Sequence, residues 1–340
     1  MPDFLNFKKL LSKEKISVGL NIGVSSIKMV KLLFAKDGVQ LAGFCVEENQ
    51  VDLESVLKKI IQAHSIKRVN ISVSGQQAIT RYIEFPRMKL EELKQSLKFE
   101  APKHIPFPFA EVNLDAYILR SDLPENKMKV LLAAVKKEYL NQRLKLLSNL
   151  DLDVGVVDVD SLALMNAFEF NYSQEENIKN KTLALLNIGS STSNLNIMDS
   201  GYPALSRDVN IGGNNFTQKV ADMLGLDFKA AEAMKTAKDK DKSDKVAKAI
   251  EPILAKLAQE VRSSFDYYES RSITSVEKIF LSGGGSLFSG VKETLSNLLG
   301  LEVENWDPFR KIAWVVGKEQ DKLKFLSSQL AVAVGLALRQ

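Results

Sequence analysis

Three glycine-containing turns are the parts of this sequence whose residue types and spacing could do chemistry. Gly23-Val-Ser-Ser26 and Gly189-Ser-Ser-Thr192 each follow an apolar run, and Gly283-Gly-Gly285 precedes a segment that resembles the start of a helix. Backbone N–H groups and hydroxyls in such turns form concave surfaces that suit phosphate oxygens, and a helix N-terminus adds to this attraction. Lys28 could place a positive charge beside the first turn. The sequence therefore predicts a ligand that carries phosphate.

The first two turns belong to an internal repeat. Residues 16–22 and 27–31 alternate in the manner of a strand hairpin, and residues 184–198 repeat the pattern, with Asn187 at the place of Asn21 166 residues later. Each turn alone could serve only a backbone with positive φ. Three turns, two of them related by the repeat, favour a nucleotide held between two similarly built lobes.

The other segments predict the elements that position these turns. Helical spacing over residues 51–65 and a strand at 69–73 follow the first hairpin. From about residue 80 the order of predicted strands and helices changes, and this change predicts an inserted α+β module. Its expected elements are a strand at 81–85, a helix at 90–100, a proline-interrupted stretch at 101–109, strands at 113–119 and 129–135, a helix at 137–149 and a strand at 154–159.

The C-terminal half is predicted to be mainly helical between its strands. Residues 217–266 have helical spacing, interrupted by the charged run 236–245, which we interpret as a solvated loop or helix end. A strand precedes Gly283, and an apolar helix over 327–338 closes the chain with a small-residue face at Ala331, Ala333 and Gly335.

Composition excludes several classes of function. The 340 residues carry a net charge of +4 that is spread along the chain, which disfavours nucleic-acid binding. One cysteine and two histidines cannot build a four-ligand zinc site or an internal disulfide. The longest apolar run, 330–338, is too short to span a bilayer, and the N-terminus lacks the pattern of a secretory signal. We therefore expect a cytoplasmic protein.

Four further stretches carry a resemblance to a known family: Phe99-Glu-Ala-Pro-Lys-His-Ile-Pro-Phe-Pro108, Val154-Gly-Val-Val-Asp-Val-Asp-Ser-Leu-Ala-Leu164, Ser206-Arg-Asp-Val-Asn-Ile-Gly-Gly-Asn214, and Leu281 to Gly290 together with Asn305-Trp-Asp-Pro-Phe-Arg310. With the order of the three turns, they resemble the actin-like ATPase superfamily, and within it the PilM family of type IV pilus assembly, which is related to FtsA. The resemblance runs from about residue 16 to the C-terminus.

This resemblance implies an α/β, actin-like (ribonuclease H-like) two-lobed fold with an inserted α+β subdomain, and ATP or ADP in the interlobe cleft. The implied domains are a flexible tail at 1–15, first-lobe core at 16–80, the inserted subdomain at 81–160, first-lobe core at 161–181, second-lobe core at 182–213, a helical nucleotide-lining subdomain at 214–272, second-lobe core at 273–320, and a closing helix on the first lobe at 321–340.

The resemblance also assigns nucleotide contacts by position. The first phosphate loop is Asn21, Gly23, Ser25, Ser26 and Lys28, and the second is Asn187, Gly189, Ser190, Ser191 and Thr192. The adenosine turn is Gly283, Gly284, Gly285 and Ser286, and Gly335 of the closing helix completes this set. Base and ribose are expected to contact Gly212, Gly213, Asn214, Lys219, Glu232 and Lys235.

One departure from the family pattern concerns the metal ion. The family has Asp before Ile-Gly in both hairpins, where this sequence has Asn21 and Asn187. Mg²⁺ prefers carboxylates and water to amides, so its binding should be weakened. We therefore expect a nucleotide-binding scaffold with weak or absent hydrolysis, although both amides could equally serve only to cap the strand ends.

The implied partner is the cytoplasmic N-terminal peptide of the inner-membrane protein PilN, held by the inserted subdomain, which would associate the chain with the inner membrane. Two alternatives stay open. A phosphotransferase of the sugar-kinase type would use Asp158 or Asp160 as a base, although a structural role for both is favoured. A GspL-like type II secretion component would continue into a membrane span, whereas this sequence ends at Gln340.

Overall fold

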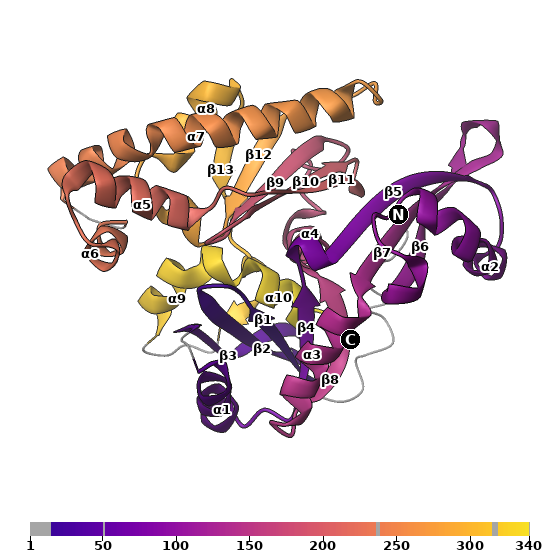
Figure 1. The fold of residues 1–340 in the computed structure, drawn as a ribbon, viewed down its shortest axis with the longest axis horizontal. Coiled ribbons are helices and arrows are strands. Elements are labelled where there is room, and N and C mark those ends of the chain that lie inside the picture. The colour runs from indigo at the N-terminus through magenta and orange to yellow at the C-terminus, as the bar shows by residue number, and fades with distance from the viewer. Residues whose placement is uncertain (1–14, 50–51, 236–238, 315–318, 340) are drawn as a thin grey trace. The chain divides into compact units, whose positions relative to one another are not determined.

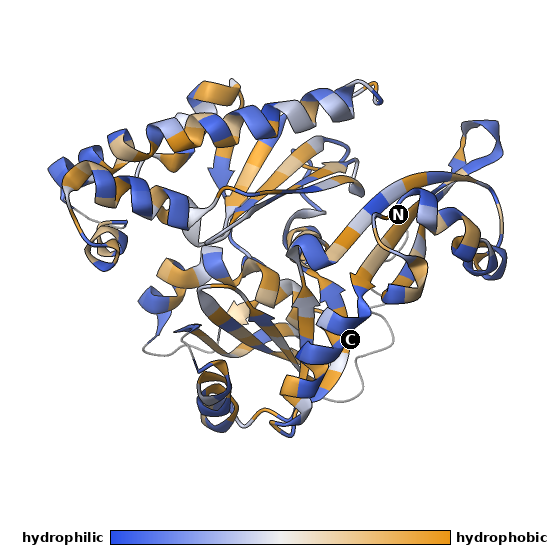
Figure 2. Cartoon of the chain, viewed as in Figure 1, coloured by the Kyte–Doolittle hydropathy of each residue, from blue (hydrophilic) through white to orange (hydrophobic). Residues whose placement is uncertain are grey.

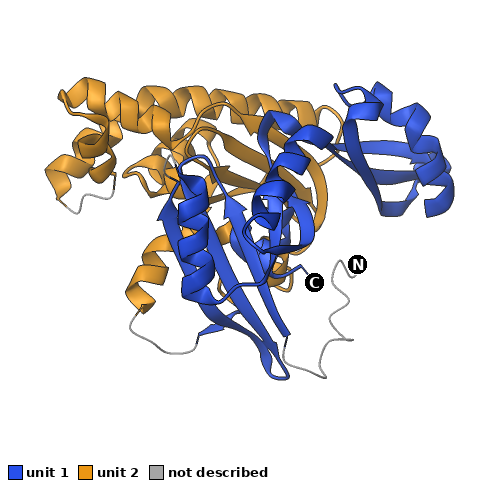
Figure 3. Cartoon of the chain, turned by 60° about the horizontal axis from the view of Figure 1, so that its bottom comes forward, with its two compact units in different colours: residues 1–166, 311–315, 332–340 blue, residues 167–310, 316–331 orange. Residues whose placement is uncertain are grey.

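The computed structural model describes residues 15–49, 52–235, 239–314 and 319–339. The chain divides into two compact units, coloured separately in Figure 3. Unit 1 comprises residues 1–166, 311–315 and 332–340, and unit 2 comprises residues 167–310 and 316–331. The predicted tail at 1–15 lies outside the described residues, except for Lys15, which begins the first strand.

Unit 1 is built on a six-stranded sheet of order β14-β3-β2-β1-β4-β8. Strands β1, β2 and β3 form an antiparallel meander, while β4 and β8 run parallel to β1. The predicted first hairpin is confirmed, but β3 was not predicted. The bounds are β1 Lys15–Ile22, β2 Ser26–Ala35, β3 Gly38–Glu48, β4 Arg68–Val73, β8 Asp153–Val159 and β14 Ala313–Trp314.

Helices α1 (Leu53–His64) and α3 (Lys137–Ser148) border the main hydrophobic core of this sheet. Helix α1 forms where the sequence predicts it because Asp52 caps it by accepting a hydrogen bond from the Ser55 N–H. Its residues Leu57 and Ile60 are buried against the sheet together with Leu147, which follows from their helical spacing.

The inserted segment of unit 1 forms a separate three-stranded antiparallel sheet of order β5-β7-β6. Its core of apolar side chains includes Leu93 and Leu97 from α2, which cover one face of the sheet. The segment is labelled at the right of Figure 1. The bounds are β5 Ala78–Pro86, α2 Leu90–Glu100, β6 Val112–Leu123 and β7 Lys127–Lys136.

The inserted module is shorter than predicted. Strand β8 pairs with β4 along residues 153–159, so it belongs to the six-stranded sheet. Leu147, Leu150 and Leu152, at the end of α3 and after it, pack into the core of that same sheet. The alternation of apolar residues marks a strand but does not say which sheet it joins, and this is why the segment from 137 to 160 was assigned to the insertion.

Unit 2 repeats the arrangement of unit 1 on a five-stranded sheet of order β11-β10-β9-β12-β13. Strands β9, β10 and β11 are antiparallel, and β12 and β13 run parallel to β9. This matching order confirms the repeat that the sequence predicts. The bounds are β9 Thr182–Ile188, β10 Ser193–Asp199, β11 Tyr202–Val209, β12 Lys278–Ser282 and β13 Glu302–Asn305.

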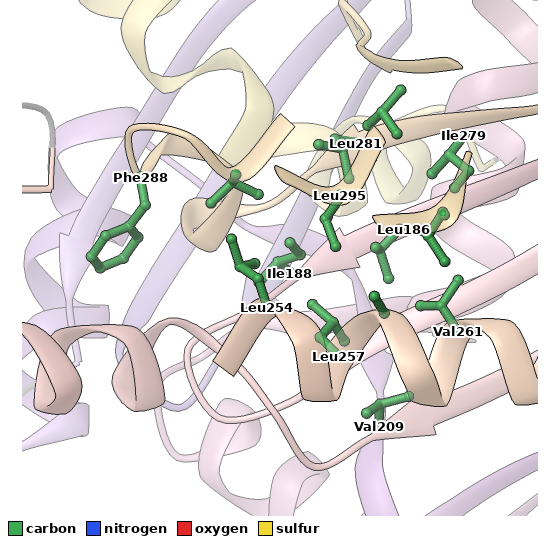
Figure 4. Close-up of a cluster of buried hydrophobic side chains, with 14 of the residues drawn as sticks. Leu186, Ile188, Val209, Leu254, Leu257, Val261, Ile279, Leu281, Phe288 and Leu295 are labelled. Atoms are coloured by element: carbon green, nitrogen blue, oxygen red, sulfur yellow. The ribbon is translucent and has the colours of Figure 1, made fainter. Parts of the chain in front are cut away.

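One face of the unit 2 sheet is covered by helices. Figure 4 shows Leu254, Leu257 and Val261 of α7 directed toward strand residues such as Leu186 and Leu281. Figure 2 shows hydrophobic strands beside helices of mixed character, as expected where each helix buries one stripe. The helices are α5 Gly213–Leu224, α6 Phe228–Ala233, α7 Lys240–Glu269 and α8 Val291–Leu299.

In unit 2, the helix-end interpretation of the charged run is confirmed for its described residues, whereas the helix expected directly after the triple glycine is not found. Residues 240–245 of the charged run form the first turns of α7, where Asp239 caps the helix, while 236–238 lie outside the described residues. The turn at Gly283 is followed by a short 3₁₀ turn over Gly284–Leu287, and the helix α8 begins only at Val291. The triple glycine therefore does not stand at a helix N-terminus.

The chain passes between the units four times, and two of these passages fall within helical segments. One boundary falls after Asn166, inside α4 (Asp160–Tyr172), and another falls at the start of α10 (Ala331–Ala337). The expected domains 161–181 and 321–340 are therefore each shared by both units. The closing helix is also broken, into α9 (Gln320–Leu326), a 3₁₀ turn over Ser327–Leu330, and α10.

The described residues contain no helix that is both long and apolar enough to cross a membrane.

Close backbone contacts fix α10 within unit 1. A Cβ at Gly335 would lie 1.7 Å from the Ala163 carbonyl oxygen of α4, and a Cβ at Gly19 would lie 2.1 Å from the Ala333 oxygen. The Asn166 side chain donates to the Gly335 carbonyl at 2.8 Å. This packing accounts for Gly335 without any ligand, although the sequence analysis placed it in the nucleotide set.

We predict that Gly335→Ala lowers the free energy of unfolding by more than about 2 kcal/mol, because α10 and α4 must separate to admit the methyl group. The measurement is urea denaturation. Gly43→Ala is the matched control, since its Cβ would meet only the His64 ring at 3.3 Å. Equal stability of the two variants would contradict the packing role of Gly335.

Candidate functional site

Both predicted phosphate turns have the same backbone geometry. The Gly23 N–H donates to the Ser26 carbonyl at 3.0 Å, and the Gly189 N–H donates to the Thr192 carbonyl at 2.9 Å. Each turn joins two antiparallel strands at the end of the central strand of its sheet. Ligands of such sheets bind outside the carboxyl ends of the strands, which is where both turns lie.

The turn in unit 1 gathers the residues that the sequence analysis grouped there. The Lys28 ammonium lies 3.4 Å from the Ser26 carbonyl, and a Cβ on Gly23 would lie 3.1 Å from the same nitrogen. Asn49 anchors the turn: its side chain donates to the Gly23 carbonyl at 2.8 Å and its N–H to the Ser25 carbonyl at 2.9 Å. Asn49 was not predicted, because it directly follows β3, a strand that the sequence did not predict.

Asn21 lies at the same sheet edge, beside polar residues of two neighbouring strand ends. Its side-chain nitrogen donates to Asp160 Oδ1 at 3.2 Å and to the Ser72 hydroxyl at 3.1 Å. Asn21 is only 7% exposed. Because a carboxylate only accepts hydrogen bonds, the amide nitrogen of Asn21 faces Asp160.

Asp158, the other candidate base, has a structural partner. Its Oδ2 accepts from Arg339 Nε at 2.7 Å, and its Oδ1 accepts from the Val159 N–H at 2.8 Å. The Asp158 carboxylate is 7% exposed, so this ion pair is the interaction that makes its burial tolerable. Asn70 donates to the Arg339 carbonyl at 2.8 Å and so holds the same end of the chain.

The second turn, in unit 2, is docked on the start of α5. The Gly213 N–H donates to the Gly189 carbonyl at 2.8 Å, and the Asn214 N–H to the Ser190 carbonyl at 2.7 Å. A Cβ on Gly212 would lie 2.7 Å from the Ser190 oxygen, so only glycine allows this approach. The structure thus brings the predicted phosphate residues 189–190 and the predicted ribose residues 212–214 together.

The triple-glycine turn lies against the end of β9 in the same unit. A Cβ on Gly283 would lie 2.4 Å from the Ile188 carbonyl, and one on Gly285 would lie 2.2 Å from the Ile188 side chain. The Asn187 oxygen accepts from the Ser282 hydroxyl at 3.2 Å. Ser286 donates to the Gly283 carbonyl at 2.7 Å, which closes the turn.

A polar cluster in unit 2 is formed by residues of α5, of α6 and of the turn after α6. Glu232 accepts from the Thr217 hydroxyl and from Lys235, whose ammonium lies 2.6 Å away. The same ammonium lies 4.9 Å from the centre of the Phe288 ring. A Cβ on Gly213 would lie 3.8 Å from that ring, which connects the cluster to the turn at Gly189.

Two predicted residues stand apart from this cluster, and two of its members were missed. Lys219 lies two residues beyond Thr217 on α5, about 200° around the helix, so the two do not share a face. Gly335 packs against α4 in unit 1. Thr217 and Phe288 were missed, because nothing in their local sequence distinguishes them from core residues.

The residues that would hold Mg²⁺ do not fit that ion. Asn21 presents its amide nitrogen to Asp160, and Asn187 offers a neutral amide oxygen that already accepts from Ser282, whereas Mg²⁺ prefers carboxylate oxygens and water. Among the described residues, no group of three or more His, Cys, Asp and Glu side chains could hold a metal ion. Within unit 2, the hydroxyls of residues 190–192 and the Lys235 ammonium are groups that suit a phosphate-bearing ligand.

Comparisons with known proteins identify the family and the fold of this chain. A family profile described as type IV pilus assembly protein PilM matches residues 19–340. The chain is similar to the solved structure "PilM-PilN type IV pilus biogenesis complex", with 27% identity, a TM-score of 0.83, and coverage of 95% of this chain and 98% of that chain. It shares a fold with the ethanolamine utilization protein EutJ from Carboxydothermus hydrogenoformans, at 14% identity, a TM-score of 0.58 and coverage of 95% and 89%. The fold is the actin-like fold that the sequence predicts.

We predict that Asp158→Asn lowers the free energy of unfolding by about 1 to 3 kcal/mol, because it leaves Arg339 without its anion in a mostly buried setting. Arg339→Met should cost a similar amount, and the double variant should cost little more than either one. Urea denaturation of the three variants measures this coupling. Additive losses would show that the two residues act separately.

Proposed function

The chain belongs to the family of the type IV pilus assembly protein PilM, and on this premise we propose that it is a cytoplasmic, nucleotide-binding scaffold of a type IV pilus machine that binds the N-terminal peptide of PilN. One observation supports nucleotide binding. Within unit 2, four features lie close together: the Gly189 turn, the start of α5, the Gly283 turn and the Glu232–Lys235 pair. Association with the inner membrane follows through the partner.

The proposal assigns ATP or ADP to this convergent set. The hydroxyls and backbone of 189–192 face phosphate oxygens, and Gly283 to Ser286 face the adenosine. Lys235 is only 18% exposed and is fixed by both Glu232 and the Phe288 ring, so it is oriented before the ligand arrives. Orientation in advance reduces the entropy that binding costs. Hydrolysis is weak or absent, since both family carboxylates are amides in this chain.

The two alternatives have less support. A sugar-kinase mechanism needs a carboxylate free to accept a proton, whereas Asp158 is paired with Arg339 and Asp160 accepts from Asn21. A GspL-like secretion role is disfavoured, because the profile of the pilus family matches nearly the whole chain.

The inserted segment is the proposed docking site for the PilN peptide. It exposes large apolar side chains near its proline-rich stretch, with Phe99 68% exposed and Phe109 40% exposed. Exposed aromatic groups close together in sequence are typical of protein-binding surfaces. Lys98 and Lys136 lie over the rings of Phe99 and Phe107, and they add positive charge to the same segment.

We predict that Lys235→Met weakens binding of a fluorescent ATP analogue about tenfold. Fluorescence titration, with phosphate release followed in parallel, measures binding and turnover together. Lys229→Met, at an exposed position of the preceding helix α6, is the control and should bind as the unmodified protein does. Binding that is unaffected by Lys235→Met would contradict the assigned site, and rapid phosphate release would contradict the scaffold role.

We predict that the double change Phe99→Ala and Phe109→Ala weakens binding of a synthetic PilN N-terminal peptide about tenfold, through loss of apolar contact area. Isothermal titration calorimetry measures this. Phe325→Ala removes an equally exposed ring from unit 2 and serves as the control. If only the control variant loses affinity, the peptide does not dock on the inserted segment.

A further inference from the structure

The carboxyl edge of the unit 1 sheet holds an acidic group that is already paired. Asp160 follows β8 and accepts from the amide nitrogen of Asn21 at 3.2 Å. Ser72, at the end of β4, accepts from the same nitrogen at 3.1 Å. Both N–H bonds of this amide are therefore directed at oxygen atoms of neighbouring strand ends.

A divalent cation at such an edge would be held by oxygen lone pairs. Here the lone pairs of Asp160 and Ser72 that face β1 are engaged by the Asn21 amide, which offers hydrogen atoms instead. Asn21 and Ser72 are 7% and 9% exposed, so water screens this contact little. The amide nitrogen thus stands where the positive charge of a cation would stand.

The equivalent position in unit 2 also lacks a carboxylate, but its amide is oriented differently. Asn187 at the end of β9 accepts from Ser282 at the end of β12, with which it is in register. A neutral amide oxygen paired with a hydroxyl lacks the negative charge that draws Mg²⁺ from water. Neither repeat of this chain therefore keeps a carboxylate at this position.

We propose that Asn21 replaces the divalent cation beside Asp160, so that this chain folds and binds its nucleotide without Mg²⁺. The statement about nucleotide rests on the function proposed above, whereas the statement about Asn21 and Asp160 concerns the protein alone. An Asp at position 21 would face the Asp160 carboxylate at hydrogen-bond distance, and these two like charges would repel each other unless a cation lies between them or one carboxyl takes up a proton.

The experiment compares thermal unfolding of the nucleotide-free full chain in EDTA and in MgCl₂ or MnCl₂. The unmodified protein should have the same Tm in all three. Asn21→Asp should have a lower Tm in EDTA and regain it with either metal, and Mn²⁺ binding to this variant should appear by electron paramagnetic resonance. Asn113→Asp adds a charge at an exposed strand position and should show neither effect.

The exchange variant Asn21→Asp with Asp160→Asn keeps one amide and one carboxylate in contact. In EDTA this variant should have the Tm of the unmodified protein, and its Tm should not respond to metal. This result would separate the effect of the amide–carboxylate pair from a general effect of charge. The proposal is overturned if the unmodified protein gains stability from Mg²⁺ and Asp160→Asn abolishes that gain. It is also overturned if Asn21→Asp is as stable in EDTA as the unmodified protein.

A nucleotide titration tests whether the chain binds its nucleotide without Mg²⁺. Affinity of the unmodified protein for a fluorescent ADP analogue should change by less than about twofold when EDTA replaces MgCl₂, and a loss of about tenfold would overturn metal independence. If no nucleotide binds under either condition, the proposed nucleotide function fails. The melting experiments still decide whether Asn21 replaces a cation, so the two failures are distinguishable.

Discussion

Close approach of backbone to backbone at glycine positions is the constraint on which both units depend. In unit 1, Gly335 and Gly19 let α10 lie against α4 and β1, with a carbonyl oxygen where a Cβ would stand. In unit 2, Gly212 rests on the carbonyls of the Gly189 turn, and Gly283 and Gly285 rest on Ile188. Any side chain at these positions would push apart segments whose hydrogen bonds define the fold.

These contacts also explain why polar residues gather at one edge of each sheet. The glycine turns end the central strands, and the parallel neighbours end at the same edge, so polar residues from separate segments meet there. Thr217, Glu232 and Lys235 reach the unit 2 edge because α5 begins directly on the turn at Gly189. The packing that stabilises the fold therefore also orients the polar groups.

The repeat has diverged in its charges while keeping its backbone. Both hairpins close with the same glycine hydrogen bond, and both central strands carry Asn two positions before the glycine. In unit 1 the amide donates to Asp160, whereas in unit 2 it accepts from Ser282. An amide can do either because it carries both a donor and an acceptor, so the two repeats present different electrostatic surfaces with the same residue.

The sequence by itself determined the local features: the repeated hairpin, the helices at 53–64 and 90–100, and the glycine turns. These follow from periodicity, capping and residue type, which act over a few neighbours. Only the tertiary structure decided that β8 joins β4, that Gly335 packs on α4, that Asp158 pairs with Arg339, and that Asn21 holds Asp160. These contacts join residues more than 80 positions apart, and local pattern carries no information about which distant partner a strand or side chain meets.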